Sequence, residues 1–131
     1  MIMHPITTFT AAILGAWLIV LSARVIRMRG KAGVAIGDGG NDLLSRRIRA
    51  HGNFCEYAPL ALILLFLAEA QGANFWLLTI SALLLLAGRL MHGTALSFTT
   101  KWVLGRVGGM IATFGAIGVL VLANLWVLAS S

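Results

Sequence analysis

Acidic side chains are almost absent from this 131-residue sequence, which contains four Asp and Glu residues against ten Lys and Arg. Charged residues of both signs make up only 11% of the chain, whereas a soluble globular domain carries about 25%. Hydrophobic residues make up 60%, and the mean hydropathy is +0.95. This composition excludes an ordinary soluble domain and indicates an integral membrane protein. The single cysteine, Cys55, also excludes an internal disulfide.

Long segments lack charge altogether. Residues 1–23, 70–88 and 107–131 contain no Lys, Arg, Asp or Glu. Each segment can cross a hydrocarbon core, which takes about 20 residues of helix. The first segment differs from a signal peptide because its apolar run is too long and positive charge follows it instead of preceding it. We therefore interpret it as a retained transmembrane span.

The net charge of +6 does not predict nucleic-acid binding, because the basic residues are not spread over a surface. Seven of the ten Lys and Arg residues lie between positions 24 and 49. Such bunching beside a hydrophobic segment is typical of membrane topology. Membrane lipid is therefore a predicted partner, and nucleic acid is not.

The remaining apolar run, residues 57–68, has only 12 uncharged residues and is short for a span. If it crosses the membrane, the basic segments at 24–49 and 101–106 share one side, and both chain ends share the other. The positive-inside rule favours that arrangement. We predict an all-α, integral membrane four-helix bundle, a single domain over residues 1–131, with both termini outside and the basic loops in the cytoplasm. Glycines between residues 105 and 118 would permit close helix contacts.

The second helix must include its polar start to be long enough. A helix from about residue 43 to residue 70 is roughly 42 Å long. The preceding GDGGND segment, residues 37–42, predicts a turn with Asn41 or Asp42 as the helix N-cap. It lacks the lysine of a phosphate loop and the ligand spacing of a metal loop, so no metal site is predicted. Residues 69–75 form a short outer link, and Trp76 and Trp126 fit an outer aromatic belt.

Polar side chains gather on one face of this second helix. At about 100° per residue, they share a sector of about 100°; its members are Arg46, Arg49, Asn53, Glu56 and Tyr57. Arginines that anchor the helix to lipid headgroups would explain only part of this set. A carboxylate at the edge of lipid is costly unless it pairs or faces a polar cavity. We interpret the face as a ligand site, with a purely structural ion-pair cluster as the alternative.

The chemistry of this face suits a small zwitterion that carries several carboxylates. Arginines present planar forks to carboxylates, an asparagine amide both donates and accepts, and a glutamate accepts from an ammonium or amide group.

Three segments resemble the MAPEG family, the membrane-associated proteins in eicosanoid and glutathione metabolism. RAHGNFCEYAP, residues 49–59, resembles the family's second-helix signature R-A-x-x-N-x-x-E-Y-x-P. IRMRGKA (26–32) and AGRLMH (87–92) are similar to the basic end of the first helix and the core of the third. The resemblance covers nearly the whole chain and is closest to the small bacterial members. It implies an inner-membrane homotrimer that holds glutathione between neighbouring subunits near the cytoplasmic face.

The resemblance also implies roles for individual residues. The implied glutathione ligands within one subunit are Arg49, Asn53, Glu56, Tyr57 and His92. Two further residues, Arg27 and His51, would reach glutathione from a neighbouring subunit; on the helical wheel His51 lies at about 200° from Arg49, off the polar face. An arginine at the start of the fourth helix stabilises the thiolate in eicosanoid-making members, and Arg106 matches it best, with Lys101 as the alternative. Leu96 stands where better-known members have a tyrosine that contacts glutathione.

The expected function is that of a membrane-bound glutathione transferase. A fixed guanidinium beside a thiol lowers its pKa from about 8.5 and so raises the thiolate fraction. The thiolate would conjugate an apolar electrophile that arrives through lipid, and the same sulfur would support peroxide reduction. Two alternatives remain open at this stage: a non-catalytic membrane scaffold that still binds glutathione, and a small transporter.

Overall fold

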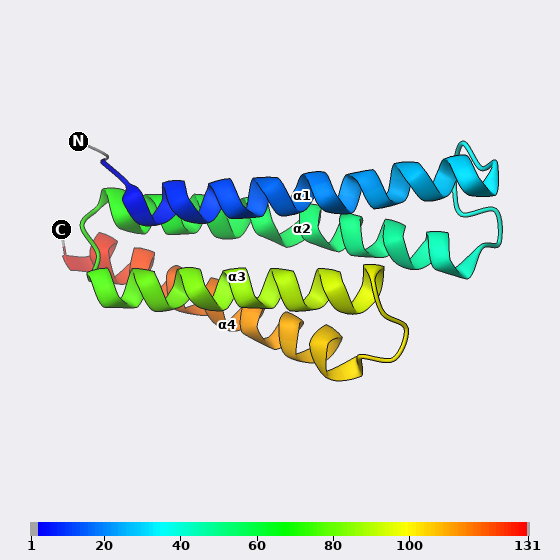
Figure 1. Ribbon diagram of the computed structural model, residues 1–131. Helices are drawn as coiled ribbons and strands as arrows, with labels where there is room; N and C mark the ends of the chain where they lie inside the picture. Colours follow the sequence, from blue (N-terminus) through cyan, green and yellow to red (C-terminus); the bar gives the residue numbers. More distant parts are fainter. Residues whose placement is uncertain (1–2, 131) are drawn as a thin grey trace.

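The computed structural model describes residues 3–130 as four helices joined by short turns. They are α1 (Pro5–Ala32), α2 (Asp42–Ala70), α3 (Phe75–Ser97) and α4 (Val103–Ser130), and no strand occurs within the described range. Successive helices run in opposite directions, so the two chain termini lie at the same end of the bundle (Figure 1). Each helix is long and apolar enough to cross a membrane. The prediction of an all-α bundle with four spans is confirmed.

The boundaries of α2 agree with those predicted, and its first turn has the expected cap. The Asn41 side chain accepts a hydrogen bond from the backbone N–H of Leu44 at 2.9 Å. Glu69, predicted to start the outer link, lies instead in the last turn of α2. Its carboxylate accepts from the backbone N–H groups of Ile6 at 3.0 Å and Thr7 at 2.8 Å. Because the first N–H groups of a helix lack partners within the helix, Glu69 caps α1 and fastens it to α2.

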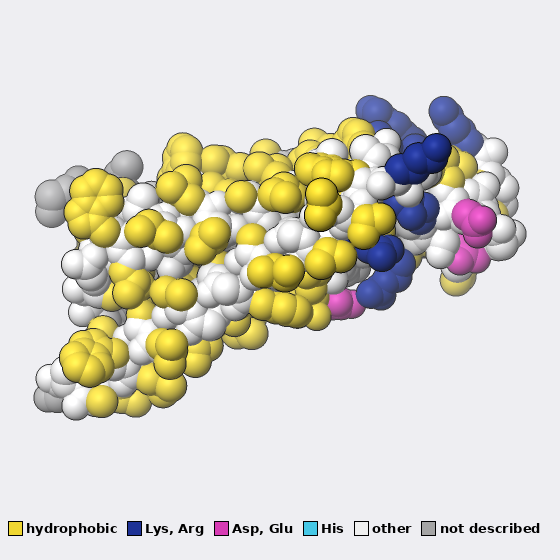
Figure 2. Space-filling view, turned by 90° about the horizontal axis from the view of Figure 1, so that it is seen from below, with side chains coloured by type: hydrophobic (Ala, Val, Ile, Leu, Met, Phe, Trp, Pro, Cys, Tyr) yellow, Lys and Arg dark blue, Asp and Glu magenta, His cyan; other side chains and the backbone are white. Residues whose placement is uncertain are grey.

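Exposed basic side chains gather at one end of the bundle. Lys and Arg side chains form a band at the end opposite the termini, and apolar side chains cover most of the remaining length (Figure 2). Two tryptophans near the termini, Trp76 and Trp126, are 68% and 75% exposed. This distribution suits a membrane-spanning body with one basic rim and an aromatic belt at the other. Which rim faces the cytoplasm stays a prediction.

The closest helix contact joins α3 to α4 through two glycines. A Cβ atom on Gly88 would lie 2.7 Å from the carbonyl oxygen of Gly109, and the reverse distance is also 2.7 Å. Small residues allow helix backbones to approach in this way. Two other glycines of α4, Gly115 and Gly118, have no non-local atom within 4 Å of a built Cβ in the described protomer. Among the described residues, the predicted close helix contact is therefore made only by the half of α4 near the basic rim, against α3.

Candidate functional site

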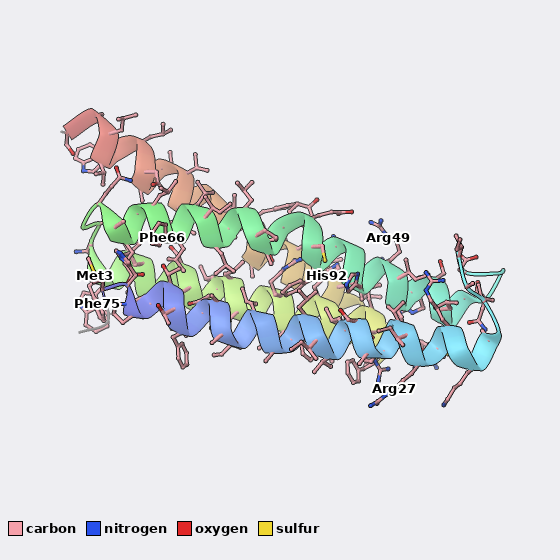
Figure 3. All side chains as sticks on the ribbon, turned by 90° about the horizontal axis from the view of Figure 1, so that it is seen from above. Met3, Arg27, Arg49, Phe66, Phe75 and His92 are labelled. Atoms are coloured by element: carbon pink, nitrogen blue, oxygen red, sulfur yellow. The ribbon has the colours of Figure 1, made fainter. Side chains whose placement is uncertain are left out.

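The polar face of α2 divides into an exposed part and a buried part. The side chains of Arg49 and Glu56 are 64% and 51% exposed, and Arg49 Nη1 lies 3.9 Å from Glu56 Oε1. Figure 3 shows Arg49 pointing away from the protomer. Asn53, on the turn between them, is only 8% exposed and faces the bundle. The polar face of α2 thus presents two exposed charged side chains, Arg49 and Glu56, with the buried amide of Asn53 behind them.

A buried arginine, Arg89, holds the Asn53 amide. The sequence alone predicted no role for it. Arg89 of α3 is 1% exposed. Its guanidinium donates to Asn53 Oδ1 at 2.8 Å and to Thr113 Oγ1 of α4 at 2.9 Å, and Nη2 lies 3.3 Å from Met110 Sδ. One side chain therefore ties α2, α3 and α4 together. The sequence nevertheless indicates such a role, because Arg89 is the only charged residue between residues 70 and 100, and charged residues within a membrane usually face the interior of a helix bundle.

His92 lies one turn beyond Arg89 and shares its surroundings. It is 5% exposed, and the charged groups that act on it are Arg89, Arg106 and Arg49. Tyr57 packs edge-to-face on Phe114 of α4 with ring centroids 5.3 Å apart, and the Arg89 guanidinium carbon lies 5.7 Å from the Tyr57 ring centroid. The structure therefore places most of the predicted site residues, which are glutathione ligands and the thiol activator Arg106, on three neighbouring helices. These residues are Arg49, Asn53, Glu56, Tyr57, His92 and Arg106.

Two predicted ligands do not join this group within one protomer. Arg27 is exposed on α1, and Figure 3 shows it at the edge of the protomer opposite to Arg49. His51 is half-buried, and its Nε2 lies 3.9 Å from the sulfur of the exposed Cys55. A contribution of Arg27 or His51 from a neighbouring subunit stays a prediction.

Arg46, a member of the predicted polar face, serves a different purpose. Its Nη2 donates to the carbonyl oxygens of Ala95 at 3.1 Å and Thr99 at 2.8 Å, at the end of α3. Within the protomer this arginine is therefore bonded to the end of α3, in contrast to the exposed Arg49. The helical wheel places Arg46 beside Arg49, but it does not show that the end of α3 lies against it.

A wide surface groove lies away from these residues. It has a volume of about 920 Å³ and separates the second half of α4 from the link between α2 and α3, at the end that carries the termini. Its lining, which includes Leu77, Leu122 and Trp126, contains no Asp, Glu, Lys, Arg, His or Cys among the described residues.

The donor set at the basic end suits a peptide-like zwitterion. Within residues 3–130, no group of three or more His, Cys, Asp and Glu side chains is placed to hold a metal. The open Arg49 guanidinium fits a carboxylate, and the open Glu56 carboxylate fits an ammonium group.

Comparison with known proteins adds independent information. The profile of the MAPEG family matches residues 7–126. Inner membrane protein YecN from Escherichia coli strain K12 is 44% identical over 116 residues, which cover 88% of this chain and 87% of the relative. The protein of the same name from Escherichia coli strain CFT073 matches with the same identity and coverage. Both names state a location and no activity.

Proposed function

The chain belongs to the MAPEG family, and from this premise we propose that it is a glutathione transferase of the bacterial inner membrane. It conjugates the glutathione thiolate to apolar electrophiles that arrive through lipid, and the same sulfur reduces peroxides. The observation that carries the proposal is the open Arg49–Glu56 pair on α2, with Asn53 between them held by Arg89 of α3, which also binds Thr113 of α4.

The exposure of Arg49 and Glu56 supports a ligand at this place. Counted back from Ala70, Arg49 lies about 32 Å along α2, close to the edge of a hydrocarbon core about 30 Å thick. Open charges at this depth are costly unless they face a polar partner, and the 3.9 Å separation between the two side chains leaves both able to bind other groups. A glutathione carboxylate on Arg49 and its ammonium on Glu56 would satisfy both.

The position of Arg27 supports assembly into a ring. Arg27 and Arg49 project from opposite edges of the protomer (Figure 3), so one protomer does not place both on a single ligand. A second copy with α1 beside the α2 of its neighbour would do so, and repetition of this head-to-tail contact closes a ring. We take the number of subunits, three, from the family. The ligand would then lie between subunits, with Arg27 and His51 supplied by the neighbour.

The chemistry assigned to the site is simple. The glutathione S–H bond breaks, the proton passes to water at the cytoplasmic face, and the thiolate sulfur forms a bond to the electrophilic carbon. A leaving group departs from that carbon with the bonding electrons or, on addition to a polarised double bond, the neighbouring carbon takes a proton from water. Reduction of a peroxide consumes two glutathione molecules: the first thiolate cleaves the O–O bond and releases an alcohol, and the second thiol converts the resulting sulfenic acid to glutathione disulfide and water. Arg106 would stabilise the thiolate, because a guanidinium stays protonated where a partly buried amine does not. Arg106 is also in the first turn of α4, where the helix dipole favours a nearby anion.

Leu96 favours a second candidate, a scaffold that binds glutathione without turning it over. It packs against the core formed by α1, α2, α3 and α4 and offers no hydroxyl group where better-known members have a tyrosine. A measurement of thiolate formation separates the two functions, since a scaffold binds glutathione without ionising it.

The test compares four alanine variants by calorimetry and by thiolate absorbance in the ultraviolet. Each variant must first show native helicity and the mass of a trimer in mild detergent. Charge-assisted hydrogen bonds are worth about 1.5–3 kcal/mol each, so Arg49→Ala should weaken glutathione binding at least tenfold. His51→Ala should do less, and Arg47→Ala, on the other side of α2, least. Arg106→Ala should keep much of the binding and lose the thiolate signal. Equal binding by the Arg49 and Arg47 variants would mean that the polar face is a headgroup anchor.

A further inference from the structure

The end of α3 near the basic rim lacks the usual helix C-cap. The last carbonyl groups of a helix lack partners within the helix, and a left-handed glycine or a basic residue in the last turn commonly supplies one. In α3 the last turn contains no basic residue, and the C-cap position is Phe98 in right-handed conformation. Local donors reach part of this end: the backbone N–H groups of Phe98 and Thr99 donate to the Thr94 carbonyl oxygen, and Thr99 Oγ1 donates to that of Ala95 at 3.1 Å. The carbonyl oxygens of Ser97 and Thr99 accept from donors on other helices.

Arginines from two other helices supply these donors. Arg46 of α2 donates through one nitrogen, Nη2, to the carbonyl oxygens of both Ala95 and Thr99. Arg24 of α1 donates to the side-chain oxygen of Ser97 at 2.8 Å and to its carbonyl oxygen. Both are cations at the negative end of the helix dipole, which is the favourable arrangement. The end of α3 is thus fixed against α1 and α2.

Stacking reinforces the contact made by Arg24. Its guanidinium carbon lies 3.5 Å from the centroid of the Phe98 ring, and the other partner of that ring is Trp17 of α1, stacked with centroids 5.9 Å apart. Arg24 and Trp17 therefore hold the first residue after α3, and Arg46 holds Thr99, the next residue along the chain.

The same turn determines where α4 begins. Only residues 98–102 separate α3 from α4. The Trp102 ring lies over Gly105, where a Cβ atom would come within 2.3 Å of the ring, and the backbone N–H of Arg106 donates to the Trp102 carbonyl oxygen at 3.3 Å. Arg46 and Arg106 also line one small cavity of about 20 Å³ between α2 and the start of α4. A shift of the turn would therefore be transmitted to Arg106.

We propose that Arg46 is a positioning residue, which acts through its two bonds to the end of α3 to hold Arg106 where it stabilises the glutathione thiolate. This inference rests on the proposed function and assigns Arg46 no contact with glutathione. It predicts that loss of Arg46 changes the ionisation of bound glutathione more than its affinity, because misplacement of a catalytic group lowers its effect without removing the ligand's other contacts.

The experiment titrates the thiol of bound glutathione against pH in the assembled protein, with glutathione affinity measured on the same samples. Arg46→Gln should raise the titration midpoint by about one pH unit, equivalent to about tenfold less thiolate below the midpoint, and should change affinity less than about threefold. Arg29→Gln is the matched control, since Arg29 also donates to backbone carbonyls, those of Ala35 and Gly37 in the α1–α2 turn. Its midpoint should equal that of the unaltered protein. If Arg46→Gln does not assemble, Arg46→Lys, which keeps the charge without the planar fork, replaces it and should show a smaller shift of the same sign.

A double variant separates positioning from a direct effect of the Arg46 charge. If Arg46 acts through Arg106, adding Arg46→Gln to Arg106→Gln should shift the midpoint no further than Arg106→Gln alone, since residues that act as a unit are not additive. An additional shift in the double variant would overturn the proposal, as would a normal midpoint for Arg46→Gln beside a raised one for Arg106→Gln. A normal midpoint for Arg106→Gln would instead contradict the proposed thiol activation.

Discussion

Replacement of Gly109 by alanine tests the α3–α4 contact that supports the site. The new Cβ would lie 2.7 Å from the carbonyl oxygen of Gly88, 2.8 Å from the backbone nitrogen of His92 and 2.9 Å from its Cβ. Two of these neighbours are backbone atoms, so the clash is relieved only if the helices separate. Overpacking of this kind costs about 1–3 kcal/mol, and the better helix propensity of alanine returns about 0.5–1 kcal/mol. We expect a net loss of about 1–2 kcal/mol in the free energy of unfolding.

The assay is loss of helicity on titration with a denaturing detergent in mixed micelles, and glutathione affinity is measured on the same variants. Gly115→Ala is the matched control, because it lies on the same helix with no non-local atom within 4 Å of its built Cβ. It should gain about 0.5–1 kcal/mol from helix propensity. Gly109→Ala should also weaken glutathione binding, since the displaced atoms belong to His92. If Gly109→Ala were as stable as Gly115→Ala, the backbones would not be in contact and the argument would be refuted.

Two further predictions concern Arg89 and the orientation of the chain. Arg89→Met should weaken glutathione binding about tenfold, because Asn53 loses its donor. It should change the free energy of unfolding by less than about 2 kcal/mol, since a buried charge replaced by an apolar side chain of similar size is often tolerated. A larger loss of stability, measured by calorimetry, would contradict this prediction. A cysteine introduced at Ser130 in a Cys55→Ser background should react in intact cells with a thiol reagent that does not cross the inner membrane, and protection of that cysteine until the membrane is permeabilised would reverse the predicted topology.

The spans and their boundaries could be predicted because they depend on local properties. Charge-free length, the one-sided distribution of Lys and Arg, and the Asn41 cap all act within one helix or its adjoining turn. The helical wheel likewise grouped Arg49, Asn53 and Glu56 correctly on one side of α2. It did not show that Asn53 is buried while its neighbours are open, because exposure depends on which helix lies opposite.

The missed contacts all join helices that are distant in the sequence. Arg89 contacts Asn53, 36 residues away, and Thr113, 24 residues away. Glu69 caps a helix that begins more than 60 residues earlier. No periodicity within a single helix encodes such pairings, since they are set by how each helix is rotated against its neighbours. A lone charge in an apolar segment indicates that a partner exists, but it does not identify the partner.

The arginines of the basic rim therefore fall into two groups with different consequences. Members of the first group donate to groups within the protomer; they are Arg24, Arg29, Arg46, Arg47 and Arg89. Members of the second group are exposed; they are Arg27, Arg49 and Arg106. Within residues 3–130 the only salt bridge joins Arg49 to Glu56, at 3.9 Å. A membrane protein gains little from fixed, open cations close to lipid unless something of opposite charge meets them. An anionic peptide ligand held between neighbouring copies would meet the second group, while the first group keeps the three helices that present it in register.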